Sequence, residues 1–342
     1  MTAQTSAGTP YSDPAYPGKI LEDILEKKLA APIKASNFIR VKGGFSREIW
    51  AFDATSNNKT YELILCKDGG NGAVDTGRES LSRVEEFQLL KHLKHYNNPV
   101  PEVICAGNTF GSSEQAYLIM ARVAGETDVA PLINDPYYKT QQQKFSQQMA
   151  TMLATIHRSP ICKDLFPTEP SNQRNIIATE TERWCSAIES MPGALTPSIT
   201  KAIKWLKSHM PPPPEKPVLV HGDFRVGNMI YGKEGIRTVL DWEMAHIGDP
   251  LEDVAWAQLC TWTGKPGGLV DCDAWFSEYT KASGQKISHQ ALKFWDVISI
   301  VKMTGLAFRA ASKSTDNREI KFLNRLIEIL RNDLDSRLLK QE

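Results

Sequence analysis

Apolar residues in the first part of the chain recur with two different periods, which predict helices and strands in a definite order. Residues 20–29 have helical spacing, whereas 37–41 and 48–54 are typical of strands separated by a glycine pair. A third strand over 61–67, a charged amphipathic helix over 78–95 and strands over 102–106 and 116–120 follow. This order predicts a small sheet with a helix inserted after its third strand.

The remainder of the chain is mainly helical in pattern. Residues 136–160 carry apolar side chains at helical spacing, and the prolines at 211–214 form a stiff connector into the apolar strand 218–220. A second short strand is expected at 238–240. Strands in the first part and helices in the second predict an α+β fold with segregated halves rather than a doubly wound sheet.

The length of 342 residues suits two lobes, because single cores rarely grow beyond about 250 to 300 residues. Residues 1–18 are rich in Thr, Ser, Pro and Gly and are predicted to form a flexible tail. We expect an antiparallel β-sheet lobe with one helix over 19–122 and a helical lobe over 123–342. Gly125 marks the expected hinge between them.

Charge, cysteine spacing and hydropathy limit the expected partners, redox state and location of the protein. Forty Lys plus Arg balance forty Asp plus Glu, so neither nucleic acid nor an anionic membrane is an expected partner. The six cysteines form no C-x-x-C pair and are expected to be reduced thiols. No stretch approaches the roughly 18 apolar residues of a membrane span, and we expect a cytoplasmic protein.

The strand 218–220 is followed by the sequence HGDFRVGN, residues 221–228. Asp223 and Asn228 are separated by five positions, which is the spacing of a kinase catalytic loop. Asp241 follows Asn228 by thirteen positions (241 − 228 = 13), at the end of the next apolar strand. Phosphoryl transfer needs oxygen ligands for Mg²⁺ and a carboxylate near the attacking hydroxyl, and these side chains could supply both.

A glycine turn in the first part of the chain could contact phosphate groups. Its residues are Gly43, Gly44, Phe45 and Ser46. Glycine allows the backbone to approach a ligand closely, so the N–H groups of this turn are candidate phosphate donors.

The sequences HGDFRVGNMI, LDWEMAHIGDPLEDVAW and GGFSREIW resemble those of the aminoglycoside phosphotransferase-like kinase family. The chain is most similar to the branch of kinase domains associated with acyl-CoA dehydrogenases. The resemblance covers the chain from about residue 20 and implies a protein-kinase-like fold with ATP between a nucleotide-binding lobe and an acceptor-binding lobe. It also implies that Asp223 is the catalytic base and that Asn228 and Asp241 bind Mg²⁺.

The same resemblance implies that Glu86 pairs with a basic residue at the end of the third strand. Relatives have Arg or Lys where this chain has Cys66, so the phosphate-binding cation is either Lys67, shifted by one position, or missing. A shift of one residue turns a side chain to the opposite face of a strand. This irregularity keeps open the alternative of a nucleotide-binding pseudokinase.

The backbone that would recognise adenine is expected at Met120, Ala121 and Val123. Backbone recognition leaves little signal in side chains, so GTP remains possible in place of ATP.

Other polar residues near these motifs have structural alternatives. We expect His221 to bond backbone groups and hold Asp223, and Glu243 to be structural rather than a second metal ligand. Asp249 and Asp253 are expected to cap or support a helix. Arg225 is a candidate to contact phosphate, with a structural role equally open. A catalytic role for His157 is not expected.

Three residues on a predicted helix, Trp295, Lys302 and Arg309, share one stripe because they are seven positions apart. They could clamp an anionic substrate, although a solvated rim is the favoured interpretation.

Residues 261–342 contain thirteen Lys plus Arg against ten Asp plus Glu. This balance favours a neutral or anionic alcohol, such as a hydroxyacid or hydroxyacyl-CoA, over a polycationic aminoglycoside. An antibiotic kinase and a metal-dependent hydrolase using the same carboxylates remain alternatives, and the oligomeric state is open.

Overall fold

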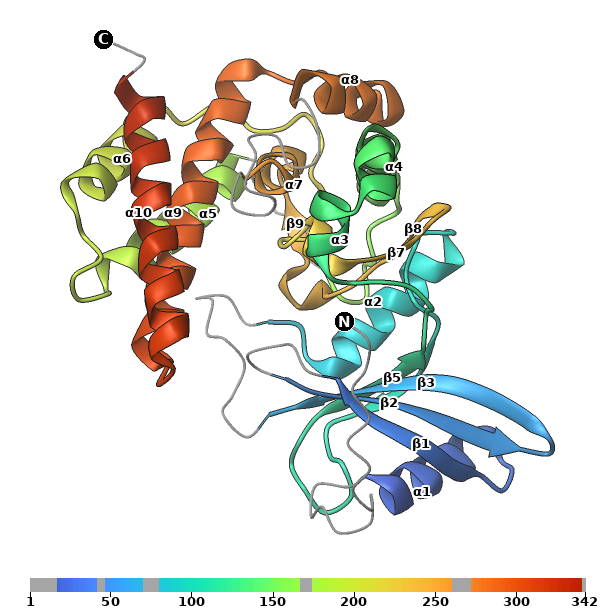
Figure 1. Cartoon of the computed structure of the whole chain (residues 1–342). Helices are drawn as coiled ribbons and strands as arrows, with labels where there is room; N and C mark the ends of the chain where they lie inside the picture. The colour runs from blue at the N-terminus through green and yellow to red at the C-terminus, as the bar shows by residue number, and fades with distance from the viewer. Residues whose placement is uncertain (1–16, 42–46, 70–79, 167–173, 260–271, 340–342) are drawn as a thin grey trace.

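The structure is a computed structural model that describes residues 17–41, 47–69, 80–166, 174–259 and 272–339. Figure 1 shows a sheet lobe built from the first part of the chain and a mainly helical lobe built from the rest. The predicted α+β fold is therefore confirmed. No helix within these ranges combines the length and the apolar character that crossing a bilayer requires.

Five antiparallel strands form the sheet lobe in the order β1-β2-β3-β5-β4. Their bounds are β1 Lys34–Val41, β2 Arg47–Ser56, β3 Lys59–Asp68, β4 Val103–Gly107 and β5 Tyr117–Ala121. The β2–β3 hairpin turns at Asn57 and Asn58, whose φ angles of 46° and 64° suit a two-residue turn that follows the strand twist. The resulting register pairs Arg47 with Asp68.

Two helices cover opposite faces of this sheet. The helix α1, Gly18–Leu29, packs into one core with Leu65 of β3, whereas α2, Arg83–His95, packs into the main core with Cys66. Successive side chains of a strand point to opposite faces. Lys67 therefore lies on the α1 side of the sheet and Cys66 on the α2 side.

The helix that was predicted to begin at residue 78 begins at Arg83. Ser82 and Glu85 form a capping box there, in which each side chain accepts a hydrogen bond from the other residue's backbone N–H. The N–H of Leu81 donates to the carbonyl oxygen of Glu243 at 3.0 Å. This contact ties the start of α2 to the helical lobe.

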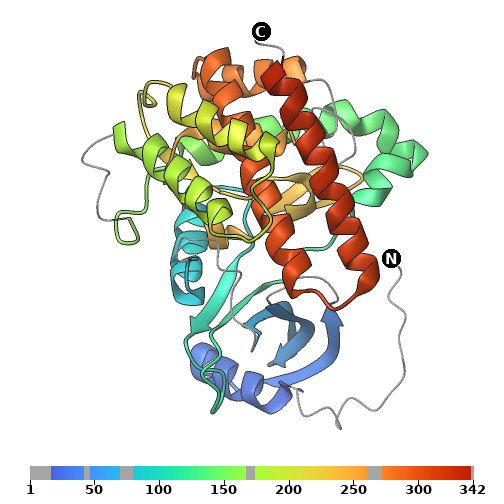
Figure 2. The ribbon, with the colours of Figure 1, turned by 90° about the vertical axis from the view of Figure 1, so that its left-hand side faces the viewer.

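Short strand pairs lie inside the helical lobe. The helices are α3 Val129–Asn134, α4 Pro136–Arg158, α5 Arg174–Glu189, α6 Pro197–Ser208, α7 Pro250–Ala257, α8 Cys272–Ser283, α9 His289–Lys313 and α10 Asn317–Leu339. The strands are β6 Val218–Val220, β7 Met229–Gly232, β8 Gly235–Val239 and β9 His246–Gly248, paired antiparallel as β6–β9 and β7–β8. Figures 1 and 2 both show α9 and α10 side by side.

Gly125 lies where the chain passes from one lobe to the other. Its φ is +143°, and a Cβ atom there would lie 2.6 Å from the carbonyl oxygen of Tyr231. The next residue, Glu126, exchanges two backbone hydrogen bonds with Tyr231, at 2.9 and 3.0 Å. The connection is thus held against β7 by a close backbone approach that only glycine permits.

Replacing Gly125 by Ala should destabilise the fold by about 3 kcal/mol, since the new methyl group combines backbone strain with a clash against Tyr231. Gly193→Ala is the matched control, because Gly193 also has positive φ but a Cβ there would meet nothing within 4 Å. The control should lose only about 1 kcal/mol. Urea unfolding measures both, and equal losses would show that the contact with β7 is unimportant.

Candidate active site

Three side chains fix the carboxylate of Asp223, which lies just beyond the end of β6. The indole N–H of Trp256 donates to its Oδ1 at 2.7 Å, and Nδ2 of Asn228 donates to its Oδ2 at 2.7 Å. Nε of Arg225 lies 3.2 Å from each oxygen. Each oxygen thus accepts one short hydrogen bond and shares the Nε donor of Arg225. The side chain is 17% exposed and can be reached from solvent.

The loop that carries Asp223 is held in place by the buried carboxylate of Asp253. Asp253 on α7 accepts hydrogen bonds from the backbone N–H groups of His221 at 2.7 Å and Gly222 at 2.9 Å. His157 also contacts Asp253, at 3.2 Å, and lies against Tyr279. The expected supporting role of Asp253 therefore agrees with the structure, and Asp249 caps α7 as expected. Both ring nitrogens of His157 contact buried protein groups.

His221 is fully buried and uses both ring nitrogens within the protein. Its Nε2 donates to the carbonyl oxygen of Leu240 at 2.9 Å, and its Nδ1 accepts from the N–H of Asp223 at 3.1 Å. This agrees with the expectation that His221 bonds backbone groups. The ring also links the loop to the residue that precedes Asp241.

Asn228 and Asp241 lie at adjoining ends of β7 and β8. The N–H of Leu240 donates to the carbonyl oxygen of Asn228 at 2.8 Å, which brings the two positions together across the hairpin. Asp241 has a φ of 69°, which is unusual for a residue other than glycine and is often found at functional sites. Since Nδ2 of Asn228 is used by Asp223, its amide oxygen and the Asp241 carboxylate form a donor set suited to Mg²⁺.

Arg47, the first residue of β2, contacts this donor set directly. Its Nη1 lies 2.8 Å from Oδ1 of Asp241, and its Nη2 forms an ion pair with Glu243. Burial acts to lower the pKa of Arg47, but the surrounding carboxylates, with Asp241 first, raise it above its ordinary value. Burial raises the pKa of Glu243, while Arg47 acts against this shift. The contact with Arg47 supports the expected structural role of Glu243.

Of the two alternatives for the cation at the end of β3, the structure does not pair Lys67 with Glu86. Nζ of Lys67 lies 3.0 Å from Glu48, on the α1 side of the sheet. Glu86 instead pairs with Nη1 of Arg83, at 2.5 Å. Cys66 faces α2, and burial raises the pKa of its thiol to about 11, so it carries no charge at neutral pH. The shift of one position has turned the lysine to the opposite face.

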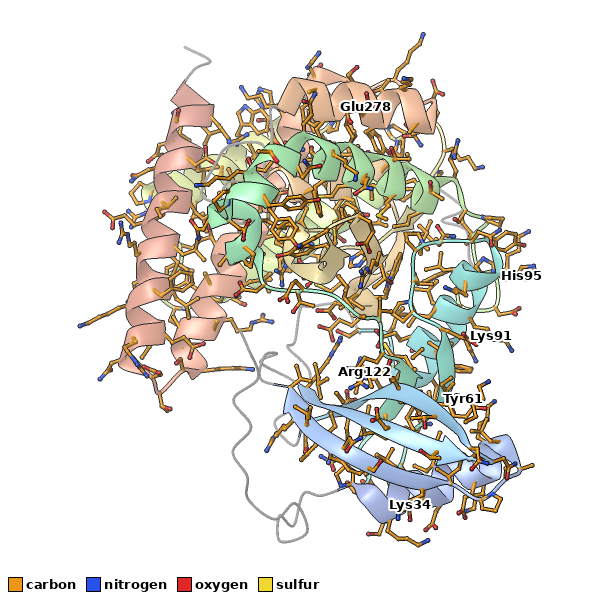
Figure 3. All side chains as sticks on the ribbon, turned by 45° about the vertical axis from the view of Figure 1, so that its right-hand side comes forward. Lys34, Tyr61, Lys91, His95, Arg122 and Glu278 are labelled. Carbon is orange, nitrogen blue, oxygen red and sulfur yellow. The ribbon has the colours of Figure 1, made fainter. Side chains whose placement is uncertain are left out.

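The segment after β5, where the nucleotide hinge is expected, leads from the sheet lobe to the helical lobe. Met120 is buried, and the N–H of Ala121 donates to the carbonyl oxygen of Glu102 at 2.8 Å. Arg122, labelled in Figure 3, lies where the sheet passes into the helical lobe. No hydrogen bond is formed by the N–H of Val123 within the part of the chain that the structure describes. The glycine turn Gly43–Ser46 lies outside the described residues.

The favoured interpretation of the α9 stripe as a solvated rim is wrong for two of its residues. Trp295 and Lys302 are 0% and 1% exposed, and only Arg309 is partly exposed. Nζ of Lys302 donates to the carbonyl oxygen of Gly222 at 2.6 Å and lies 3.5 Å from Glu252. Lys302 therefore stabilises the loop that carries Asp223 and is too buried to clamp a substrate.

A buried cluster beside Lys302 contains metal-ligand types but has its own cations. Ligand atoms of Glu180, His246 and Glu252 lie within 4.8 Å of one another. His246 is bonded to Glu252 at 3.0 Å, and Glu180 pairs with Arg183. The negative charges of Glu180 and Glu252 are thus offset by the positive charges of Arg183 and Lys302. This pairing favours a structural role for the cluster over metal binding.

Three residues of the site were missed by sequence reasoning. Arg47 lies one position before the predicted strand over 48–54, and strand alternation places it on the same face as Ile49. Arg83 lies one helical turn before Glu86, a spacing at which side chains meet. Trp256 is 33 positions from Asp223 and has no local signal.

The model of the phosphotransferase enzyme family matches residues 38–295. The chain belongs to this family. It is 27% identical over 231 residues to acyl-CoA dehydrogenase family member 10 of Mus musculus, covering 62% of this chain and 20% of that protein. It is 26% identical over 246 residues to acyl-CoA dehydrogenase family member 11 of Pongo abelii, covering 65% of this chain and 30% of that protein. The chain thus spans less than a third of the length of these relatives.

Solved structures of the phosphotransferase family share the fold. A protein of Ralstonia eutropha JMP134 assigned to the aminoglycoside phosphotransferases has a TM-score of 0.72 at 16% identity, over 94% of this chain and 98% of that chain. A thermostable mutant of aminoglycoside phosphotransferase APH(4)-Ia, in complex with ADP and hygromycin B, has a TM-score of 0.65 at 17% identity, with the same coverage. The kinase-like two-lobed fold implied by the resemblance is confirmed.

Replacing Asp253 by Ala should destabilise the fold by about 3 kcal/mol, because two buried backbone N–H groups lose their acceptor. Asp164→Ala is a suitable control, since Asp164 is exposed and should change stability by less than about 0.5 kcal/mol. Thermal and urea unfolding give both values. A loss in Asp253→Ala as small as in the control would contradict the supporting role.

Proposed function

We propose that the chain is a kinase that transfers the γ-phosphate of ATP to a hydroxyl group of a small molecule. The observation that carries this proposal is the arrangement around Asp223. Its carboxylate is fixed by Trp256 and Asn228, is partly exposed to solvent, and is linked through Asn228 to the position of Asp241. A phosphotransferase needs this combination of an oriented carboxylate and adjacent oxygen ligands.

Nucleotide binding is supported by the fold and by the hinge. The similar APH(4)-Ia structure is a complex with ADP and hygromycin B. In this chain the N–H of Val123, which has no hydrogen-bond partner among the described residues, could donate to a purine. GTP is an alternative nucleotide, because backbone recognition of this kind does not by itself select adenine.

The proposed reaction is a direct in-line transfer. Asp223 accepts the hydrogen bond of the substrate hydroxyl and receives its proton as the new bond to phosphorus forms. Asn228 and Asp241 would hold Mg²⁺, which when bound offsets negative charge on the phosphates. Trp256 and Arg225 keep the Asp223 carboxylate in one orientation, so little reorganisation is needed during the reaction.

We propose a neutral or anionic alcohol, such as a hydroxyacid or hydroxyacyl-CoA, as the acceptor. Arg309 on α9 is partly exposed, and its Nη1 is buried without a hydrogen-bond partner in the described part of the chain. Figure 1 shows this end of α9 running toward the sheet lobe. A guanidinium with an unused donor fits a carboxylate or phosphate better than a cationic aminoglycoside. An aminoglycoside remains the alternative acceptor.

A coupled assay of ADP release tests this function. Wild type would be incubated with Mg²⁺ and ATP or GTP across hydroxyacids, hydroxyacyl-CoA esters, aminoglycosides, choline and homoserine. Release that depends on one class of acceptor supports the kinase and names the substrate class. Tight nucleotide binding without any release would favour the pseudokinase, and hydrolysis of esters without any nucleotide effect would favour the metal-dependent hydrolase.

Replacing Asp223 by Asn should lower kcat by about a hundredfold or more, since the amide cannot accept the proton of the hydroxyl. The affinity for nucleotide should stay within about threefold, because Asp223 would contact the acceptor rather than the phosphates. Steady-state kinetics and nucleotide titration separate the two effects. Near-normal turnover in this variant would exclude Asp223 as the base.

Replacing Asp241 by Ala should weaken the binding of ATP in the presence of Mg²⁺ by at least about tenfold, because one of the two proposed metal ligands is lost. Binding in the presence of EDTA should change much less. Isothermal titration under both conditions measures the difference. An unchanged dependence on Mg²⁺ would remove Asp241 from the metal site.

A further inference from the structure

The α2 face of the sheet has no lysine or arginine on the described part of β3. In kinases a lysine on the third strand reaches the nucleotide phosphates and pairs with a glutamate of the following helix. Here Lys67 lies on the other face with Glu48, and Cys66 is an uncharged thiol. The cation that contacts the phosphates must therefore come from another element.

Arg47 of β2 occupies the corresponding side of the sheet. The β2–β3 register pairs Arg47 with Asp68 and Ile49 with Cys66, so Arg47 lies diagonally across from Cys66 on the same face. Its side chain is 11% exposed, and its Nη1 lies 2.8 Å from Asp241. Its Nε is buried and has no hydrogen-bond partner in the described part of the chain. This guanidinium therefore has a donor that the described protein groups do not use.

The ion pairs around Arg47 have an excess of negative charge. Two arginines are joined to four carboxylates in one network, with a formal charge of 2 − 4 = −2. Its members are Arg47, Arg83, Asp68, Glu86, Asp241 and Glu243. A divalent cation at Asp241 would offset this excess and weaken the attraction that holds Arg47 to Asp241.

We propose that Arg47 supplies the phosphate-binding cation that β3 lacks, and that it moves from Asp241 to the nucleotide phosphates when Mg²⁺ and nucleotide bind. Its planar guanidinium can form two parallel hydrogen bonds to phosphate oxygens. Arg83 takes the second role of the kinase lysine, which is to form an ion pair with the helix glutamate, here Glu86. The inference rests on the proposed kinase function and assigns the cation of that same site.

The test is the dissociation constant for Mg²⁺-ATP and for adenosine, measured by isothermal titration without acceptor. Arg47→Ala should weaken the binding of Mg²⁺-ATP by about tenfold to a hundredfold, as expected for a lost bond between charged groups. Adenosine should bind within about twofold of wild type, because it has no phosphate. Adding Cys66→Arg to Arg47→Ala should restore much of the lost affinity, since a cation then returns to the β3 position.

Arg40→Ala is the matched control, because Arg40 lies on β1 over the ring of Trp50 and away from Asp241. It should leave both constants within about twofold of wild type. Lys67→Met tests the competing cation, and a loss of Mg²⁺-ATP affinity in Lys67→Met that equals or exceeds that in Arg47→Ala would overturn the inference.

Two further results would also overturn it. Unchanged Mg²⁺-ATP affinity in Arg47→Ala would exclude a phosphate contact, and an equal loss for adenosine and Mg²⁺-ATP would indicate general damage to the site. Wild type that binds no nucleotide would instead refute the proposed kinase function, and the inference with it.

Discussion

The carboxylate of Asp253 is the constraint on which the candidate active site depends. It accepts the N–H groups of His221 and Gly222 at the end of β6, where the strand no longer supplies partners. From the other side Lys302 donates to the carbonyl oxygen of Gly222. Gly222 itself has a φ of +83°, and a Cβ atom there would lie 2.5 Å from the carbonyl oxygen of Met244. These contacts fix the backbone conformation of the loop, in which the side chain of Asp223 contacts Asn228.

Buried and accessible charges have different tasks in this molecule. Asp253 and Lys302 are almost inaccessible, and each is satisfied by partners within the protein, as the high free-energy cost of burying an unpaired charge requires. Asp223 and Asp241 are 17% and 32% exposed. Their partners hold them in place while leaving each side chain partly exposed to solvent. The buried pairs therefore give rigidity to the carboxylates that are proposed to act in phosphoryl transfer.

The position of Lys67 on β3 shows why a lysine cannot be shifted by one residue along a strand and keep the same contacts. Because side chains alternate along β3, Lys67 cannot replace a cation at Cys66 by lying one residue further along. The neighbouring strand offers Arg47 on the correct face, and α2 offers Arg83 to Glu86. In the proposed arrangement, adjacent elements supply the two cations, and Arg47 lies on the same face of the sheet as Cys66.

The sequence by itself determined the order of strands and helices in the sheet lobe, the two-lobed α+β class, and the loop containing Asp223 and Asn228, because periodicity and motif spacing are local properties. It also predicted correctly that His221 would bond backbone groups. It did not predict the short strands β7 and β9. Only the tertiary structure revealed the burial of Lys302, the pairing of Arg47 with Asp241 and the contact of Trp256 with Asp223. These depend on which face of a strand or helix meets another element, and on residues far apart in the chain, so no local pattern could fix them.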